Sequence, residues 1–390
     1  MAQYHYQVSV QHDRPIGEMI HSALEDLGGL HAVIPSGKRV LIKPNLVIAK
    51  TNDTGATTSP VLIEKIIAEV CKTKPAAIAL GESSTAGDDT MKGYRVTGMD
   101  KIARKYGVKV IDFKKEPQVV KKIPQGKEIR KVKIAQTVYD YDYFINVPIL
   151  KIHGETVVTI GMKNLKGCIH DQEKHRFHRL NLHQCIVDLN TLIQPDLTIV
   201  DATTCSLHWE LGGDPLRLDT ILMSKNVLAA DIVAASLLGY GLEEVPHLKM
   251  ATQSSLGPKS INEIGIINPI GTQITEKVED ARRNSGPDYK LSDLKVIEKG
   301  ACSSCKGALV AAMRRLSREG YSPDCSVVMG QLVDQEEEKL AEAKGSGEPV
   351  VGVGRCAAKI VQNHAAKNIE GCPARAEQIY GILKKICQRS

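Results

Sequence analysis

Short apolar runs alternate along the chain with segments whose apolar residues recur every three or four positions. The short runs predict strands at residues 40–42, 76–80, 108–112, 143–147, 197–201 and 220–224. The periodic segments predict helices that begin at Ser59-Pro60 and that span residues 99–106, 156–166, 178–193 and 229–238. Such alternation is typical of a parallel sheet with helices on both faces. The predicted fold class is α/β, with a doubly wound, mostly parallel sheet.

A polar, turn-rich segment at residues 279–292 separates this region from a smaller one. Beyond it, the pattern predicts strands at 294–297, 325–329 and 350–353, helices at 305–318 and 335–344, and two more helices after Cys356 and Pro373. The sequence therefore predicts two domains. The first comprises residues 1–285, and the second is a smaller α/β domain of residues 286–390.

Composition places the chain among globular proteins. Of its 390 residues, 42% are apolar and 25% are charged, as in typical soluble domains. No run of 18 uncharged apolar residues occurs and the first residues are polar, so neither a transmembrane helix nor a signal peptide is expected. The expected location is the cytoplasm, where thiols stay reduced. Ten cysteines there favour metal binding or catalysis over disulfides.

The positive charge is concentrated in one stretch. Residues 101–133 hold twelve lysines and arginines against three acids, so the rest of the chain is slightly acidic although the net charge is +6. Only Tyr106 and Phe113 interrupt this stretch as stacking aromatics, which makes nucleic acid an unlikely partner. A solvated face, or a surface that docks an acidic ferredoxin-like electron donor, explains it better.

Four cysteines of the second domain share one kind of position. Each follows a predicted strand or precedes a predicted helix: Cys302, Cys305, Cys356 and Cys372. The strand ends of a parallel sheet gather ligands, and helix N-termini favour the thiolate form. Four thiolates can hold a [4Fe-4S] cluster or a zinc ion, and free thiols are the third alternative. A structural zinc site usually has two C-x2-C pairs, whereas only the first pair is present here.

The spacing of these cysteines also resembles a known iron-sulfur site. Cys302 and Cys305, then Gly354-Arg355-Cys356-Ala357, then Gly371-Cys372-Pro373 and the following helix start are similar to the proximal-cluster site of nickel-iron hydrogenase small subunits and to the related subunit of respiratory complex I. Ala374 stands where that pattern has a second proline, and the last interval is shorter. The resemblance implies a [4Fe-4S] cofactor on these four thiols. Cys325, at the start of an apolar strand, is expected to be a buried structural thiol.

The first domain holds a second concentration of chemistry. Lys163 and Lys166 are three residues apart and are expected to share a helix face. With Lys43, Lys151 and His153 they make a candidate cationic pocket for a carboxylate or a phosphate. His178 is expected on the next helix, in one polar stripe with Asn181, Cys185 and Asp188. Gly81-Glu82-Ser83-Ser84, at a strand end, is a weaker candidate for offering backbone N–H groups to an anion.

These segments together resemble the DUF362 family between about residues 38 and 245. The most specific block is Lys163-Asn164-Leu165-Lys166-Gly167, and the others include Lys43-Pro44-Asn45, Gly81-Glu82-Ser83 and Leu150-Lys151-Ile152-His153. The family is often associated with iron-sulfur ligands, and many members carry a ferredoxin-type cysteine run that this chain lacks. The resemblance implies a fold and a pocket but no reaction. It places Lys43, Asn45, Glu82, Ser83, Lys151 and Asn164 at the substrate, and His153, Lys163, Lys166 and His178 as catalytic candidates.

The leading hypothesis is a [4Fe-4S]-dependent reductase that acts on a small anionic substrate. Four thiolate ligands would close the cluster and suit it to electron transfer. If one cysteine is not a ligand, an open iron would instead favour a non-redox lyase, a dehydratase or desulfidase, with His153 or His178 as general acid or base. The third class is a cluster or electron carrier that catalyses no reaction itself.

Overall fold

The computed structural model describes residues 4–153, 155–207, 210–212, 215–269, 272–284, 294–301, 303–330, 336–358 and 367–388. The chain divides into two compact units, Met1–Arg282 and Arg283–Ser390. Among the described residues, no helix combines the length and apolar character needed to cross a membrane. The expected cytoplasmic location stays a prediction.

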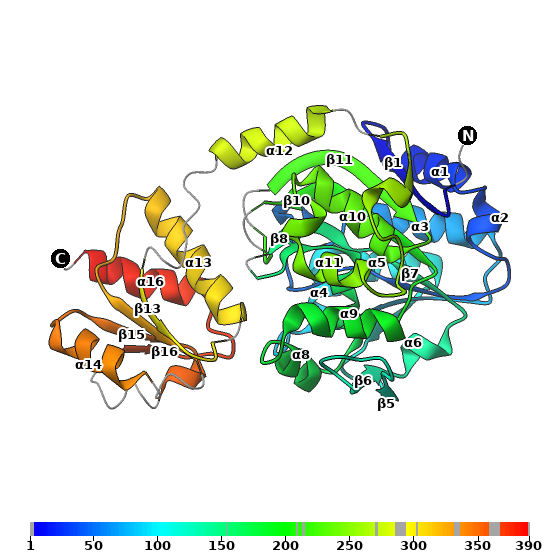
Figure 1. Ribbon diagram of the computed structural model, residues 1–390. Coiled ribbons are helices and arrows are strands. Elements are labelled where there is room, and N and C mark those ends of the chain that lie inside the picture. The colour runs from blue at the N-terminus through cyan, green and yellow to red at the C-terminus, as the bar shows by residue number, and fades with distance from the viewer. Residues whose placement is uncertain are drawn as a thin grey trace. The chain divides into compact units, whose positions relative to one another are not determined.

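The first unit is built on one large sheet (Figure 1). Its strands follow the spatial order β12-β1-β11-β10-β7-β2-β3-β4, and β8 and β9 extend it beside β10. Most neighbours are parallel, but β11 runs antiparallel to both β1 and β10. The strands are β1 Tyr6–His12, β2 Arg39–Lys43, β3 Ala77–Glu82, β4 Lys109–Asp112, β7 Tyr143–Asn146, β8 Ile149–His153, β9 Val157–Thr159, β10 Leu197–Ser206, β11 Pro215–Ser224 and β12 Ile264–Ile267. A separate antiparallel pair is formed by β5 Gln118–Lys122 and β6 Lys131–Ala135.

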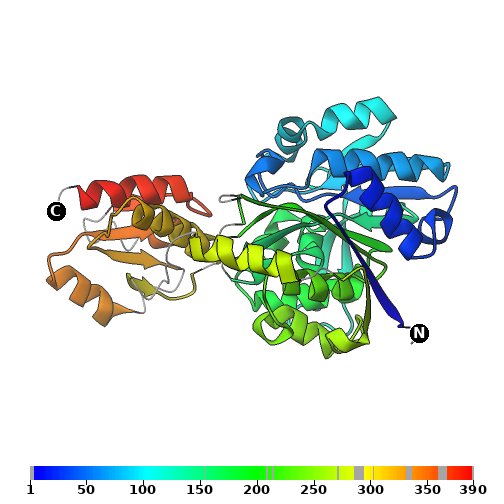
Figure 2. The ribbon, with the colours of Figure 1, turned by 90° about the horizontal axis from the view of Figure 1, so that it is seen from above.

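Helices cover both faces of this sheet, as Figure 2 shows from above. One face packs against α1 Ile16–Asp26, α3 Pro60–Lys72, α4 Thr90–Thr97 and α5 Met99–Tyr106, and the other against α9 Leu182–Leu192, α10 Val227–Leu237 and α11 Pro246–Thr252. Within β2, Val40 and Ile42 pack into the hydrophobic core on the side of α1 and α3, and Leu41 packs into the core on the side of α9 and α10. Side chains of a strand alternate between faces, so two buried faces require a continuous apolar strand. The predicted doubly wound α/β fold is confirmed.

The start of α3 has the capping pattern that the sequence predicts. The Ser59 side chain accepts a hydrogen bond from the backbone N–H of Leu62, and Pro60 occupies the first helical position. The helix predicted at 99–106 is α5. Two other predicted helices are wrong in part.

Residues 157–159 form β9, and the helix α7 begins only at Gly161 and ends at Asn164, followed by the 3-10 turn Leu165–Cys168. The helix predicted at 178–193 starts later than expected: α8 Asp171–Phe177 ends just before His178, and α9 begins at Leu182, so His178 does not share a stripe with Cys185. Asn181 caps α9 instead.

The second unit is a parallel sheet of four strands in sequence order, β13 Lys295–Glu298, β14 Ser326–Met329, β15 Val350–Val353 and β16 Lys367–Ile369. Its helices α13 Ser303–Arg318 and α16 Ala376–Cys387 lie on one face, and α14 Glu337–Gly345 lies on the other (Figures 1 and 2). The strand β16 has no counterpart among the predicted elements. The predicted linker at 279–292 begins inside α12, Thr272–Asn284, and the rest of it lies outside the described residues.

Candidate functional site

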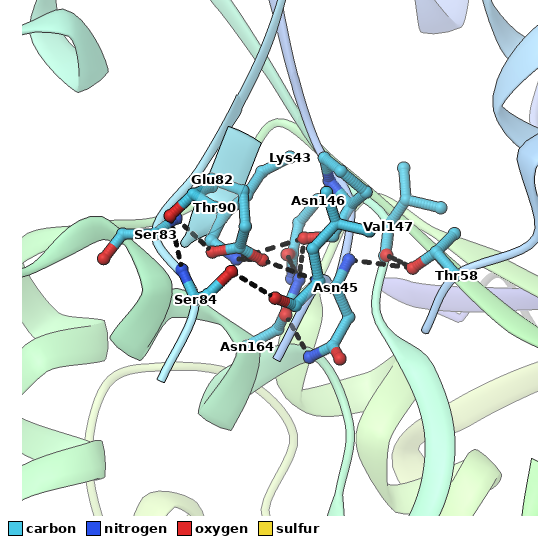
Figure 3. Close-up of polar contacts among 12 residues, drawn as sticks. Lys43, Asn45, Thr58, Glu82, Ser83, Ser84, Thr90, Asn146, Val147 and Asn164 are labelled. Atoms are coloured by element: carbon cyan, nitrogen blue, oxygen red, sulfur yellow. Dashed lines mark hydrogen bonds and ion pairs between the residues drawn. The ribbon is translucent and has the colours of Figure 1, made fainter. Parts of the chain in front are cut away.

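A buried ion pair joins the carboxyl ends of two neighbouring strands. Lys43 ends β2 and Glu82 ends β3, and their Nζ and Oε2 atoms are 2.9 Å apart with both side chains almost fully buried. Glu82 also accepts hydrogen bonds from the backbone N–H groups of Leu46 and Ser83. A carboxylate that receives backbone donors as well as an ammonium is well satisfied away from water. The pair therefore fixes the loops that follow β2 and β3 (Figure 3).

Because residue 167 is a glycine, the backbone at this position can lie directly against the ion pair of Lys43 and Glu82. A Cβ added at residue 167 would overlap Oε1 of Glu82 and would lie 2.6 Å from Nζ of Lys43. The glycine of the Lys-Asn-Leu-Lys-Gly block is therefore required by close approach of the backbone to the charges, a role that glycine alone can take.

Three asparagines extend the polar network. The Asn45 Nδ2 donates to Asn164 Oδ1 at 2.8 Å, and the Asn164 Nδ2 donates to Asn146 Oδ1 at 2.8 Å. Asn146 donates in turn to the carbonyl oxygen of Gly161 at 3.1 Å. All three side chains are buried and lie together in Figure 3. A chain of paired amides holds α7 against the ends of β2 and β7 and fixes the direction of each amide.

Asp231 fixes the other side of α7. Its two carboxylate oxygens accept hydrogen bonds from the backbone N–H groups of Gly161 and Met162 at 2.7 and 2.8 Å. These N–H groups belong to the first turn of α7 and so have no acceptor within the helix. A Cβ on Gly161 would lie 2.7 Å from Oδ1 of Asp231. Clamped in this way, α7 presents Lys163 and Asn164 beside β8, the strand that carries Lys151 and His153.

Lys151 is buried without an acidic partner within 4 Å among the described residues. Its Nζ donates to Asn45 Oδ1 at 3.1 Å and to the carbonyl oxygen of Ala56 at 2.8 Å. Burial disfavours the ammonium form and lowers the pKa of Lys151 to about 7.

Lys163 and Lys166 lie in similar surroundings. The Lys163 Nζ donates to the Thr159 hydroxyl at 3.2 Å, and the Lys166 Nζ lies 3.0 Å from Nε2 of His178. Burial lowers the pKa of Lys166 to about 8, and burial together with the charge of Lys166 lowers the pKa of Lys163 well below its ordinary value. Neither ammonium has a carboxylate within ion-pair distance in the part of the chain that the structure describes. Two neighbouring lysines, Lys163 buried and Lys166 half-buried, have neutral hydrogen-bond partners and feel the charges of Glu155 and Glu210 only from beyond ion-pair distance. Cations held in this way form a candidate anion site.

The two histidines next to these lysines are neutral. His153 Nδ1 accepts the backbone N–H groups of Glu155 and Thr156 at 3.0 and 3.2 Å, so the ring proton is on Nε2, which lies 3.6 Å from Oε1 of Glu210. Burial and the nearby lysines hold the pKa of His153 well below 6.5. Burial and Lys166 lower the pKa of His178 to about 4. Each ring thus keeps one donor and one acceptor at neutral pH.

The backbone N–H groups in the loop of residues 81–84 do not have the anion-binding role that the sequence predicts. The backbone N–H of Ser83 donates to Glu82 and that of Ser84 donates to the Thr90 hydroxyl, so both already have acceptors in the protein. The expectation that they bind an anion is therefore wrong. Lys174, which sequence reasoning missed, donates to the carbonyl oxygens of Ser83 and Ser84 at 2.9 and 2.6 Å and also to the Ser83 hydroxyl. Its role is to fix the loop, and burial lowers its pKa to about 8.

Glu210 and Asn146 were also missed as members of this site, whereas Asp231 belongs to the DUF362 resemblance as an acid expected to cap a helix, and it accepts the first N–H groups of α7. Asn146 ends a strand directly before Val147-Pro148, and strand-end polar residues are the signal that would have found it. Glu210 comes from a distant loop, and no short motif links it to Lys163.

In the second unit, the predicted cysteine ligands lie at the carboxyl edge of the sheet. Cys305 is in the first turn of α13, Cys356 follows β15 and Cys372 follows β16, whereas Cys302 lies outside the described residues. A Cβ on Gly354 would lie 3.1 Å from Sγ of Cys305. The N–H groups of Gly354 and Arg355 donate to the carbonyl oxygens of Ile369 and Gly371, both at 2.9 Å.

The loops that carry Cys305, Cys356 and Cys372 therefore meet at one edge of the sheet. Cys305 is buried and the other two thiols are exposed. Cys325 directly precedes β14, at the opposite edge, and is buried. Among the described residues, no group of three His, Cys, Asp or Glu side chains is arranged to hold a metal ion. The loops fit a cluster site in position and in thiol chemistry, and ligation by the four cysteines stays a prediction.

Comparisons with known proteins add a family and a relative. The model of a family described as a domain of unknown function, DUF362, matches residues 40–236, the region that carries all the lysines and asparagines above. A thylakoid-associated protein of Synechocystis sp. is 24% identical over an alignment of 283 residues, and the match covers 70% of this chain and 83% of the relative.

Two solved structures are similar at low identity. The lactate racemase apoprotein from Thermoanaerobacterium thermosaccharolyticum matches with a TM-score of 0.44 and 11% identity, over 98% of this chain and 90% of its own. A protein from Thermotoga maritima matches with a TM-score of 0.37 and 11% identity, over 61% and 58% of the two chains. With both TM-scores below 0.5, these likenesses carry no functional conclusion.

Removing the charge of Glu82 should destabilise the first unit strongly. We expect Glu82→Gln to lower the free energy of unfolding by about 3 kcal/mol, because it leaves the buried Lys43 ammonium without a counter-charge. The double variant Lys43→Met with Glu82→Gln should recover much of that loss, since it buries no unpaired charge. Chemical denaturation measures both. Glu64→Gln, which breaks the exposed pair with Lys105, is the control and should cost less than about 1 kcal/mol. A loss of that small size in Glu82→Gln would contradict the role given to the buried pair.

Proposed function

Because the chain belongs to the DUF362 family, whose description specifies no reaction, its activity must be argued from the site, and we propose an enzyme that binds a small anionic substrate at Lys163 and Lys166. The observation that carries this proposal is that Lys163, which is buried, and Lys166, which is half-buried, lie near each other. Among the described residues, their side-chain hydrogen-bond partners are a hydroxyl and a neutral imidazole. A carboxylate or phosphate group would supply the counter-charge that these ammonium groups lack.

The same residues are suited to moving a proton. Burial and the charge of Lys166 lower the pKa of Lys163, which favours its free amine and suits it to act as a base. His153 offers an Nε2–H donor whose orientation is fixed by the two backbone bonds to Nδ1. Lys166 and His178 form a second donor and acceptor pair. In this proposal, Lys166 binds the anionic end, while Lys163 and His153 exchange a proton with the reacting carbon or oxygen.

The thiols of the second unit support an iron-sulfur cofactor. Cys305, Cys356 and Cys372 are carried by loops that meet at the carboxyl edge of the four-stranded sheet, and these residues with Cys302 would hold a [4Fe-4S] cluster. When bound by four thiolates, such a cluster supplies single-electron transfer. The proposed reaction class is therefore a reduction of the small anion, with electrons from an acidic ferredoxin-like donor that docks on the basic stretch of residues 101–133. The proton-transfer groups would suit a lyase equally well if one of the four thiols is not a ligand.

Removing either lysine should weaken anion binding without unfolding the protein. We expect Lys163→Met and Lys166→Met each to weaken the binding of propionate or phosphate by about tenfold to a hundredfold, because each deletes a charge-assisted hydrogen bond. Isothermal titration calorimetry measures the affinity. The control is Lys72→Met, at an exposed position on α3, which should leave it unchanged. Wild-type protein that binds neither anion would refute the pocket.

Anion affinity should fall as the pH rises. Lys166 has a pKa of about 8 in the free protein, so its ammonium is present below pH 7 and is lost above pH 8. Anions prefer the protonated form, so the association constant should decline by up to about tenfold per pH unit above pH 8. Titrations between about pH 6 and about pH 9.5 test this, and Lys166→Met should show a weaker decline. An affinity that rises with pH would mean that Lys166 does not contact the anion.

The cluster has a direct chemical test. Protein purified without oxygen should contain about four irons and four acid-labile sulfides per chain, with the matching electronic and EPR spectra. We expect Cys302→Ala, Cys305→Ala, Cys356→Ala and Cys372→Ala to lose them. Cys325→Ala, at the opposite sheet edge, and Lys163→Met, in the other unit, should keep them.

The outcomes separate the three hypotheses. A cluster that survives in one of the four cysteine variants would point to an open iron and to lyase chemistry. A cluster in protein that has no saturable anion site would favour a carrier. Zinc, or no metal at all, would contradict the iron-sulfur proposal while leaving the anion pocket to be tested by calorimetry.

A further inference from the structure

We propose that His247 and His183 form a second recognition element of the same pocket, one that hydrogen-bonds a neutral polar group, a hydroxyl or carbonyl, on the substrate whose anionic end the lysines bind. The inference rests on the proposed function, and it adds that the substrate has two polar ends of different kinds.

His247 is the first observation. It is the second residue of α11, its side chain is fully buried, and neither Nδ1 nor Nε2 has a hydrogen-bond partner among the described residues. A buried imidazole has one donor and one acceptor, and leaving both unsatisfied forfeits the hydration that each would have in water. Buried polar groups in folded proteins are satisfied in the great majority of cases, so two orphaned nitrogens on one ring point to an outside partner.

His183 is the second observation and lies on a different helix. It is the second residue of α9, and its ring stacks on that of His247 with the centroids 6.0 Å apart and the planes at 22°. Its buried Nδ1 likewise lacks a partner within the described part of the chain. The helices α9 and α11 pack against each other (Figure 1). Imidazole nitrogens without a hydrogen-bond partner among the described residues thus lie on two stacked rings, one from α9 and one from α11.

The position of the two rings connects them to the lysines. Asn190 of α9 donates to the carbonyl oxygen of Met162, directly before Lys163, at 3.0 Å. The charge of Lys163 acts on both rings and, after burial, contributes to lowering the pKa of His183 and His247. Burial and this charge keep the rings neutral, so they cannot bind a second anionic group as cations.

The chemistry of the partner follows from the rings. No third His, Cys, Asp or Glu ligand joins the two rings among the described residues, which disfavours a metal ion as the partner. A neutral imidazole pairs with a group that accepts, donates or does both. A hydroxyl or carbonyl meets this requirement, whereas a methyl group of the same size would leave the nitrogens unpaired.

Isosteric pairs of carboxylates test the proposal on the whole chain. Glycolate and propionate differ by a hydroxyl in place of a methyl group, and so do 3-hydroxypropionate and butyrate. We expect the wild-type protein to bind at least one hydroxylated member about fivefold to tenfold more tightly than its isostere by calorimetry. His247→Phe and His183→Phe should remove that preference while leaving the affinity for propionate and butyrate within about twofold.

A second measurement does not depend on the folding of a variant. In protein labelled with ¹⁵N-histidine, the preferred hydroxylated anion should shift the ring signals of His247, and its isostere should not. Binding of all four anions with no preference in the wild-type protein would overturn the proposal and leave the anion pocket standing. A preference that survives in His247→Phe and in His183→Phe would also overturn it. Failure of all four anions to bind would refute the proposed function and this inference together.

Discussion

One buried charge organises the end of the sheet on which the candidate site is built. The Lys43 ammonium lies at the tip of β2 with no contact to water, and the carboxylate of Glu82, at the tip of β3, balances its charge. An unpaired ammonium there would be prohibitively costly, so the two strand ends must stay in register. Gly167 brings the backbone of the Lys-Asn-Leu-Lys-Gly block against the same pair. A single electrostatic requirement thus fixes three segments that are distant in sequence.

Lys163 and Lys166 differ from Lys43 in their hydrogen-bond partners, and this difference indicates where an anion would bind. Lys43 has a carboxylate and is closed to any further anion, whereas the other two ammonium groups are held by a hydroxyl and an imidazole. Neutral partners orient a buried lysine without neutralising it. The cost of keeping them charged appears as lowered pKa values. A ligand anion bound at Lys166 would relieve part of that cost, and the lowered pKa of Lys163 is what suits it to the proposed proton transfer.

The sequence predicts local structure better than it predicts the assembled site. Ser59 and Pro60 mark the start of α3 because a cap and a fixed φ act within one turn. By contrast, the antiparallel direction of β11 depends on pairing with β1 and β10, which lie far away in sequence. The helix expected at 156–166 fails at its start because Val157 and Val158 are taken by pairing with β8. Lys163 and Lys166 were found through their motif, but Lys174 and Glu210 act through contacts that no spacing encodes.

The same reasoning separates the cysteines of the second unit. Strand direction alone puts Cys356 and Cys372 at the carboxyl edge and Cys325 at the opposite one, since all four strands are parallel. Gly354, with a φ of +90°, then lets the loop after β15 pass against Cys305, where any side chain would press on the sulfur. A free buried thiol needs no such approach, because it is satisfied as a small apolar side chain. Close backbone contact at Cys305 and exposure at Cys356 and Cys372 are therefore the observations on which the proposed shared ligand rests, and Cys325, at the opposite edge, is the informative control.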